Sequence, residues 1–491
     1  MKIMNKIYSL TAIASAVLLM CSCGNDWLDL EPSTSISTDS SINAMQDCNA
    51  SLNGIYSVMQ NAYAYSGRLV YYGDAAGDDM QAYKVTSRTG DAYLFGYTAS
   101  NVKTSYWEYP YALISACNTI LNQVDKIETG DEDLRKYYKG QALALRGMFL
   151  FDLTRLFGYP YKKDNGASLG VPIITEVLDK DAKPSRNTVA QCYTQIIKDI
   201  KDGAELMNTK TGNAFHKGWI NRPAALSLLS RVYLYHGDDA LALSAAKDAM
   251  SAAKANKFAL WTNSEYASAW GADVDESAPG ETLFEIINLT DDSPGKEALG
   301  YLYDDYGYYD IMCTSSFYEL LSSDSKDVRN SIAPISSKRT KRVFIKKYAP
   351  QGSEIIQDAN IRLLRLSETY LNAAEAAMKT GDKKLAAEYL NAIVTRANPA
   401  KSVSEDEITL ERIMTERRLE LVGEGHRFFD ALRDGGYVER RDVSIKAISS
   451  TKHLVMSDEK KKFNWNYDHC VLPIPISEID ANNNIDQNPG Y

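Results

Sequence analysis

Histidine is scarce in this 491-residue chain, and several common catalytic motifs are absent. Only five histidines occur, and no two of them stand four residues apart, the spacing at which a helix presents two ligands to zinc. The HExxH motif of zinc peptidases and the GxxxxGK[ST] loop of nucleotide-binding proteins do not occur. Of seven cysteines, only Cys21 and Cys23 lie close together. This spacing excludes a zinc site built from two cysteine pairs, and it predicts no disulfide framework.

Long basic runs and a second long hydrophobic segment are also missing. The chain has 54 basic and 64 acidic residues, which gives a net charge of −10 at pH 7. Because nucleic-acid-binding chains are usually basic, nucleic acid is not an expected partner. Beyond the N-terminus, no stretch reaches the ~20 apolar residues that a transmembrane helix requires. No pattern calls for a cofactor.

The first 22 residues have the features of a lipoprotein signal peptide. Lys2 and Lys6 precede the apolar run AIASAVLLM, which is too short to span a bilayer comfortably. The tetrapeptide MCSC that follows resembles the apolar-small-small-Cys box of such signals, with Cys23 as the lipidated residue. The alternative, Cys21, would place the bulky Met20 directly before the cleavage site. Acyl chains on Cys23 would anchor the protein durably, because each buried CH₂ contributes ~0.8 kcal/mol.

Helical periodicity dominates the rest of the chain. Apolar residues at i, i+3, i+4 and i+7 predict helices within residues 45–63, 104–127, 137–158 and 189–207. Residues 222–253 and 362–397 are predicted to be helix pairs. In the first pair Gly237 can end one helix and Asp238 can cap the next, and Gly381 and Asp382 can do the same in the second. These pairs resemble tetratricopeptide-type repeats, so the sequence predicts a mainly α fold.

The remaining segments predict the domain organisation. Residues 258–350 are rich in Gly, Asp, Ser and Tyr and contain short apolar runs, such as ETLFEIINL and RVFIKKYAP, so we expect a loop-rich region with short strands. The Pro- and Asn-rich end, HCVLPIPISEIDANNNIDQNPGY, cannot be helical throughout and is expected to form an ordered strap with Val471, Leu472, Ile474 and Ile476 buried. We expect residues 23–40 to be a lipid-anchored tether and residues 41–491 to be a single domain.

An ordered set of motifs along the whole chain resembles one protein family. The motifs are DWLDLEP, YGDAAGDDM, YALISACNTIL, GQALALRGMFLFDLTRLFGYPY, RPAALSLLSRVYLYHGD, LRLSETYLNAAEA, ITLERIMTERRLELVGEGHRFFDALRDG and LPIPISEIDANNNIDQNPGY. Together they are similar to the SusD/RagB proteins, the nutrient-binding surface lipoproteins of Gram-negative bacteria. The resemblance implies a SusD-like fold, lipid anchoring at the outer membrane, a TonB-dependent partner of the SusC type, and binding of a glycan without cleavage.

Tyrosine-rich segments supply the candidate carbohydrate-binding residues. The chain has 32 tyrosines, and a tyrosine offers an apolar face for a sugar ring together with a polar tip. Residues 81–101 and 297–312 combine tyrosines with Asp or Arg side chains that can bind sugar hydroxyls, and the resemblance places ligand-contacting loops in these two regions. The predicted carbohydrate-binding residues are Tyr83, Arg88, Tyr93, Trp270, Tyr303, Tyr306, Tyr308 and Tyr309.

Two acidic clusters offer other hypotheses. Glu416, Glu420 and Glu424 have the spacing of one helical face and could serve glycoside hydrolysis. They alternate with four arginines, Arg417, Arg418, Arg427 and Arg433, so a structural ion-pair network is the favoured interpretation. The second cluster, Asp74, Asp78 and Asp79, is a weak calcium candidate without EF-hand spacing, and capping of helices and turns is favoured instead.

Three functions therefore remain open. The favoured one is a glycan receptor that delivers oligosaccharides to a SusC-like TonB-dependent transporter. The alternative keeps the fold and partner but binds peptides, as RagB-like relatives do. A glycoside hydrolase is the third.

Overall fold

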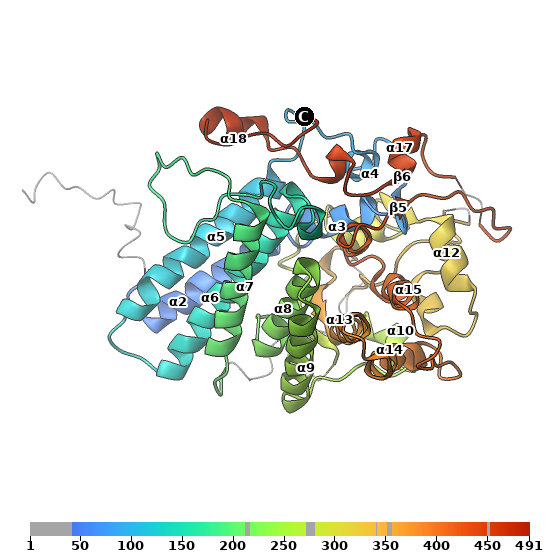
Figure 1. Ribbon diagram of the computed structural model, residues 1–491, viewed down its shortest axis with the longest axis horizontal. Helices are drawn as coiled ribbons and strands as arrows, with labels where there is room; N and C mark the ends of the chain where they lie inside the picture. Colours follow the sequence, from blue (N-terminus) through green and yellow to red (C-terminus); the bar gives the residue numbers. More distant parts are fainter. Residues whose placement is uncertain (1–41, 212–216, 272–279, 340, 351–355, 449–451) are drawn as a thin grey trace, which may run out of the picture.

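Helices are the main element of the computed structural model, which describes residues 42–211, 217–271, 280–339, 341–350, 356–448 and 452–491 (Figure 1). The predicted signal peptide, the tether and the predicted lipid carrier Cys23 lie outside the described residues. The predicted mainly α fold is confirmed. Within the described part of the chain, no helix combines the length and the apolar character needed to cross a membrane.

In the described part of the chain, nine long helices form most of the helical structure. They are α2 (Met45–Met59), α5 (Ser105–Gln123), α6 (Glu132–Phe157), α7 (Val189–Leu206), α8 (Arg222–His236), α9 (Asp239–Ala255), α13 (Leu366–Lys379), α14 (Lys383–Ala397) and α15 (Leu410–Leu421). Each of the helices α5 to α9 packs against the next, α9 packs against α13, and α13 packs against α14 and α15. In Figure 1 this row runs from α5 across the molecule to α14. The repeat-like row is therefore longer than the two pairs that the sequence predicts.

The two predicted helix pairs are present. Gly237 ends α8 with φ +101°, and Gly381, with φ +89°, precedes α14. These left-handed conformations favour glycine because it has no Cβ. Asp382 caps α14 by accepting a hydrogen bond from the backbone N–H of Leu385 at 3.0 Å. Asp238 makes no such side-chain cap at α9, and its carboxylate pairs instead with Nδ1 of His236 at 2.8 Å.

Helices α6 and α7 approach each other backbone to backbone. A Cβ atom on Gly203 would lie 2.7 Å from the carbonyl oxygen of Gly140, and one on Gly140 would lie 2.8 Å from that of Gly203. Both distances are shorter than a real Cβ contact, so any side chain would push the helices apart. Glycine at these two positions therefore sets the spacing of the helices that begin the row.

Short elements connect and flank the long helices. The short α-helices are α3 (Arg68–Ala75), α4 (Gly90–Leu94), α10 (Tyr266–Ala269), α11 (Leu299–Tyr303), α12 (Ser315–Ser322), α16 (Arg427–Leu432), α17 (Asp458–Lys461) and α18 (Ile476–Ala481). The 3₁₀ turns are η3 (Val124–Lys126), η4 (Tyr161–Lys163), η5 (Val328–Ile332), η6 (Ile356–Asp358) and η7 (Asp468–Cys470). The strands are β1 (Met80–Ala82), β2 (Thr282–Ile286), β3 (Ile311–Cys313), β4 (Ile361–Arg365), β5 (Val438–Glu439) and β6 (Lys462–Phe463).

The strands form three antiparallel pairs, β1 with β3, β2 with β4, and β5 with β6. The predicted strand in ETLFEIINL is β2. Its partner β4 occupies residues that the sequence assigns to the start of a helix, so α13 begins at Leu366, four residues later than predicted. The other predicted run, RVFIKKYAP, is extended but forms only an isolated bridge between Val343 and Ile335.

The C-terminal strap is tied to the helical core. Val471, Leu472 and Ile474 are buried as expected, but Ile476 is exposed. The backbone N–H of Leu472 donates to the carbonyl oxygen of Leu156 at 2.7 Å, which fixes the strap to the end of α6. The five described cysteines are buried free thiols.

Candidate functional site

The two predicted tyrosine-rich segments lie against each other. Strand β1 lies at the start of the first segment and β3 at the end of the second, and the two strands pair with Ala82 opposite Ile311. The backbone N–H of Tyr83 donates to the carbonyl oxygen of Asp310 at 2.9 Å, and Arg88 forms ion pairs with Asp310 at 2.9 Å and with Glu297 at 3.2 Å. Residues more than 200 positions apart thus form one surface.

Five tyrosines make up this surface, which we call the tyrosine platform: Tyr83, Tyr301, Tyr306, Tyr308 and Tyr309. Tyr306 is 65% exposed, and the other four are partly exposed. The rings of Tyr83 and Tyr309 meet edge to face with centroids 4.8 Å apart, as do those of Tyr301 and Tyr308. Edge-to-face pairs hold their rings in defined orientations. The platform is therefore a partly exposed and mutually supported aromatic surface.

A tight turn after α11 presents these rings. The backbone N–H of Tyr308 donates to the carbonyl oxygen of Tyr301 at 2.7 Å, and the carboxylate of Asp304 accepts from the backbone N–H of Tyr306 at 2.7 Å. A Cβ on Gly307 would lie 2.1 Å from the carbonyl oxygen of Tyr301, so this turn requires glycine there. Tyr309 has φ +46°, an uncommon conformation for a residue with a side chain.

Three predicted ligand-contacting residues lie in the core instead. Tyr93 and Tyr303 are fully buried and Trp270 is 2% exposed. The Tyr93 hydroxyl contacts Nδ1 of His453 at 2.6 Å, and the Tyr303 hydroxyl donates to the carboxylate of Asp74 at 2.8 Å. Their rings offer no face to a ligand, so the prediction is wrong for these three. Trp107 is also buried.

The aspartates of the tyrosine-rich stretch also face inward. Asp304, Asp305 and Asp310 are buried. Lys346 pairs with Asp304 at 2.7 Å and also with Asp305, while Arg88 holds Asp310. These carboxylates hold the turn in place and are not free to bind sugar hydroxyls. The prediction that they bind the ligand is therefore wrong.

Cations lie over the platform rings. The charged group of Lys338 is 4.1 Å from the centroid of Tyr306, and the guanidinium of Arg339 is 3.7 Å from that of Tyr309. Two further pairs are Arg342 over Tyr83 at 4.2 Å and Arg88 over Tyr308 at 3.9 Å. Of these cations the sequence analysis named only Arg88. The others come from SKRTKRVFIKK, whose interleaved basic residues were the available signal.

The calcium hypothesis for Asp74, Asp78 and Asp79 is wrong. Arg427 forms a two-bonded pair with Asp78, including a 2.9 Å contact, and Arg418 does the same with Asp79 at 3.0 and 3.2 Å. Among the residues that the structure describes, no group of three acidic, histidine or cysteine side chains could hold a metal ion. Asp78 and Asp79 are structural partners of arginines rather than caps.

Asp74 is a buried carboxyl that has no basic partner at hydrogen-bond distance among the described residues. One of its oxygens accepts from the Tyr303 hydroxyl and from the backbone N–H of Gly425 at 3.0 Å. Burial raises the pKa of Asp74 from 3.8 to about 7, even though both hydrogen bonds lower it. Folded Asp74 thus binds more protons than unfolded Asp74 between these values, and its contribution makes the protein less stable as pH rises through them.

Replacing Asp74 with asparagine should remove this pH-dependent contribution to the free energy of unfolding. The amide oxygen can still accept both hydrogen bonds, and no charge is buried. We expect the free energy of unfolding of Asp74→Asn, relative to the wild type, to rise between pH 5 and pH 8. Chemical denaturation at several pH values measures this difference. A difference that stays constant over that range contradicts the raised pKa.

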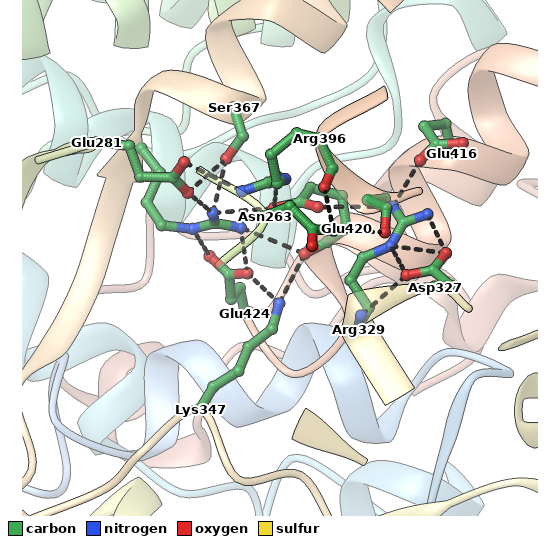
Figure 2. A network of polar contacts seen from close by, with 12 residues as sticks. Asn263, Glu281, Asp327, Arg329, Lys347, Ser367, Arg396, Glu416, Glu420 and Glu424 are labelled. Atoms are coloured by element: carbon green, nitrogen blue, oxygen red, sulfur yellow. Dashed lines mark hydrogen bonds and ion pairs between the residues drawn. The ribbon is translucent and has the colours of Figure 1, made fainter. Parts of the chain in front are cut away.

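The glutamates of the charged motif belong to a buried ion-pair network (Figure 2). Arg329 contacts Glu416 at 2.5 Å and Glu420 at 3.5 Å. Arg365 contacts Glu420 at 3.0 Å and binds both oxygens of Glu424 at 2.7 Å, and it also pairs with Glu281. Glu424 is not on the same helix, because α15 ends at Leu421.

The partners in this network differ from the predicted ones. Besides Arg329 and Arg365 they are Arg396, 2.8 Å from Glu420, Lys347, 2.5 Å from Glu424, and Arg412, 2.7 Å from Glu416. The predicted arginines bind elsewhere: Arg417 binds Asp430, Arg418 Asp79, Arg427 Asp78, and Arg433 both Glu375 and Asp430. The predicted type of interaction is confirmed, but its pairing is wrong.

The environment of Glu420 opposes acid–base catalysis. Burial alone would raise its pKa, but the positive charges of Arg396, Arg365 and Arg329 outweigh burial and hold the pKa well below the usual value. A general acid must keep its proton near neutral pH and must reach the substrate. A fully buried carboxylate with a lowered pKa does neither.

The sequence also contains one GxSxG pattern, GASLG at residues 166–170. A nucleophile elbow places this serine between a strand and a helix. Here the turn η4 precedes the pattern, and the bridge between Leu169 and Thr188 follows Ser168. The pattern lies in a connection between α6 and α7 and lacks the elbow geometry.

Comparisons with known proteins place the chain in one family. A model described as the SusD family matches residues 300–491, and one described as "Starch-binding associating with outer membrane" matches residues 26–234. A solved SusD superfamily protein from Bacteroides vulgatus is 35% identical, with a TM-score of 0.84, and the match covers 92% of this chain and 100% of that one. The chain therefore belongs to the SusD family, as its motifs predict.

Particular relatives are similar over almost their whole length. A structure described as a putative sugar binding protein from Bacteroides vulgatus is 54% identical, with a TM-score of 0.88, and the match covers 92% of this chain and 99% of that one. SusD-like protein P38 from Formosa agariphila is 22% identical, covering 84% of this chain and 88% of the relative.

Proposed function

We propose that this protein binds an oligosaccharide on the tyrosine platform and delivers it, uncleaved, to a SusC-like TonB-dependent transporter in the outer membrane. The observation that carries the proposal is the platform itself, in which exposed and partly exposed tyrosine rings from two distant segments form one surface. Rings of this kind suit the CH-rich faces of sugars. Two comparisons support the ligand class and the location. A similar solved structure is described as a putative sugar binding protein, and a matching family is described as starch-binding and associating with the outer membrane.

A glycan array tests the ligand class. Labelled protein comprising residues 24–491 should bind at least one class of oligosaccharide, and chromatography should recover that glycan with its length unchanged. A peptide library probed in parallel tests the alternative. Binding to peptides alone would contradict the proposal in favour of a RagB-like receptor, and shortened glycan would make the protein a hydrolase.

Attachment to the membrane is proposed to depend on the lipid carried by Cys23, with residues 23–40 as the tether and residues 41–491 as one domain. We expect Cys23→Ala to move the protein from the outer-membrane fraction to the soluble fraction, because the variant lacks the acyl chains. Fractionation of cells expressing each form measures this, and Cys21→Ala is the matched control. Retention of the Cys23 variant with loss of the Cys21 variant would assign the lipid to Cys21.

A further inference from the structure

The platform combines exposed tyrosines with an excess of positive charge. Six of the ten residues from 338 to 347 are basic, in a chain whose net charge is −10. They are Lys338, Arg339, Lys341, Arg342, Lys346 and Lys347. Ser336 and Arg339 lie against the tyrosine turn, because the Ser336 hydroxyl donates to the carboxylate of Asp305 and Nε of Arg339 donates to the backbone carbonyl oxygen of Asp305 at 3.2 Å. Lys338, Arg339 and Arg342 therefore lie at the tyrosine platform, each over one of its rings.

The cations at the end of this run are neutralised, but those over the rings are not. Lys346 is paired with Asp304 and Asp305, and Lys347 is buried against Glu424. Lys338, Arg339 and Arg342 form no ion pair with any carboxylate in the described parts of the chain, and the same holds for Lys296, which lies 5.8 Å from the ring of Tyr301.

Hydrogen-bond donors therefore remain for a ligand. A guanidinium carries five N–H donors. Within the described residues, the guanidinium of Arg339 donates only through Nε, and the guanidinium of Arg342 makes only a 3.9 Å contact from Nη1 to the sulfur of Met312. Asp304, Asp305 and Asp310 are buried, and Glu297, whose side chain is 38% exposed, is paired with Arg88, so the unpaired charge on this surface is positive.

From this arrangement, and resting on the proposed function, we infer that the preferred ligand is an acidic oligosaccharide whose carboxylate or sulfate groups bind Lys338, Arg339 and Arg342 while its sugar rings stack on the platform tyrosines. A neutral sugar would have to displace these cations from the ring faces without compensation. An anionic sugar compensates them through charge-assisted hydrogen bonds, for which arginine is well suited. A basic peptide would meet repulsion from the same groups.

Calorimetry with matched ligands tests this inference on protein comprising residues 24–491. The uronate probe is a galacturonic acid hexamer, with its fully methyl-esterified form as the uncharged control. The sulfate probe is a carrageenan hexasaccharide, with its desulfated form as control, and maltohexaose and xylohexaose are neutral probes. We expect one acidic probe to bind at least tenfold more tightly than its uncharged form, with affinity falling as salt rises. The probe that binds identifies uronate or sulfate as the anion.

Variants assign the preference to the platform. Lys338→Gln combined with Arg342→Gln should weaken binding of the acidic probe about tenfold, and it should not weaken binding of the uncharged form, which no longer has to displace these two cations from the rings. Lys462→Gln is the matched control, because Lys462 also lies over an exposed ring, that of Tyr437, at 5.2 Å.

Each failure has a separate meaning. Equal affinity for charged and uncharged forms, binding of neutral probes alone, or a double variant that binds the acidic probe as the wild type does would overturn the inference and leave the proposed function intact. If no glycan binds here or on the array, both fall.

Discussion

Replacing Glu420 with glutamine is expected to lower the free energy of unfolding by about 3–5 kcal/mol while leaving glycan affinity unchanged. Glu420 is fully buried and contacts Arg365, Arg396 and Arg329. Glutamine keeps the shape of the side chain but removes the negative charge, so three buried guanidinium groups lose a counter-charge. Breaking a buried pair costs more than the pair itself contributes, because an uncompensated charge stays out of water.

Chemical denaturation of the variant and the wild type measures this loss of stability. A glutamate-to-glutamine substitution at an exposed site is the control. Glu439 pairs with Lys462 at 3.4 Å, with side chains 45% and 54% exposed, so Glu439→Gln should change stability by less than about 1 kcal/mol. The pKa of Glu420 is lowered in the folded state, so its contribution is present above the unfolded pKa near 4.5 and is lost as pH falls through the folded value. Unchanged stability with lost turnover of a glycan would instead make Glu420 catalytic.

The second large effect concerns the platform. Tyr306→Ala combined with Tyr308→Ala should weaken glycan binding at least tenfold, or about 1.4 kcal/mol, because two stacking faces are removed. Tyr306 is 65% exposed and Tyr308 is partly exposed, so we expect the double variant to keep its fold, which circular dichroism checks. Calorimetry measures the affinity.

Tyr437→Ala provides the matched control for this experiment. Tyr437 is 51% exposed and also lies beneath a lysine, but it is not part of the platform. Its loss should leave affinity unchanged. If the platform variant binds its glycan as the wild type does, the binding surface lies elsewhere on the molecule.

Local features made the helical part of the fold predictable. Periodicity located the long helices, and Gly237 and Gly381 located the turns within two helix pairs, because a left-handed conformation is a property of a single residue. Of the β2–β4 pair, only strand β2 was predicted. Residues 361–365 have apolar residues that suit a helix, and only their partner in β2 makes them a strand.

The ion-pair partners could not be predicted because they are far apart in the sequence. The spacing of Glu416, Glu420 and Glu424 suggested one helical face, but α15 ends before Glu424, and Gly423 and Gly425 turn the chain with φ +79° and +77°. The partners come from segments up to about a hundred residues away, so the neighbouring arginines were the wrong choice.

The same reason applies to the tyrosines. Inward-facing and outward-facing side chains do not alternate along residues 297–312. A short helix, α11, and a tight turn precede β3, so burial does not follow a period of two. Tyr303 is core and Tyr306 is exposed, although both stand beside aspartates in the sequence. That these aspartates face inward depends on Lys346 and Arg88, which no local pattern connects to them.

A crystal structure of residues 24–491 with the glycan selected by the array tests the central claim most directly. We predict sugar rings stacked on Tyr306 and Tyr308, with the ligand within hydrogen-bond distance of the cations over the platform. A glycan bound at a distant part of the molecule, with the platform rings and their cations unchanged, would contradict the account.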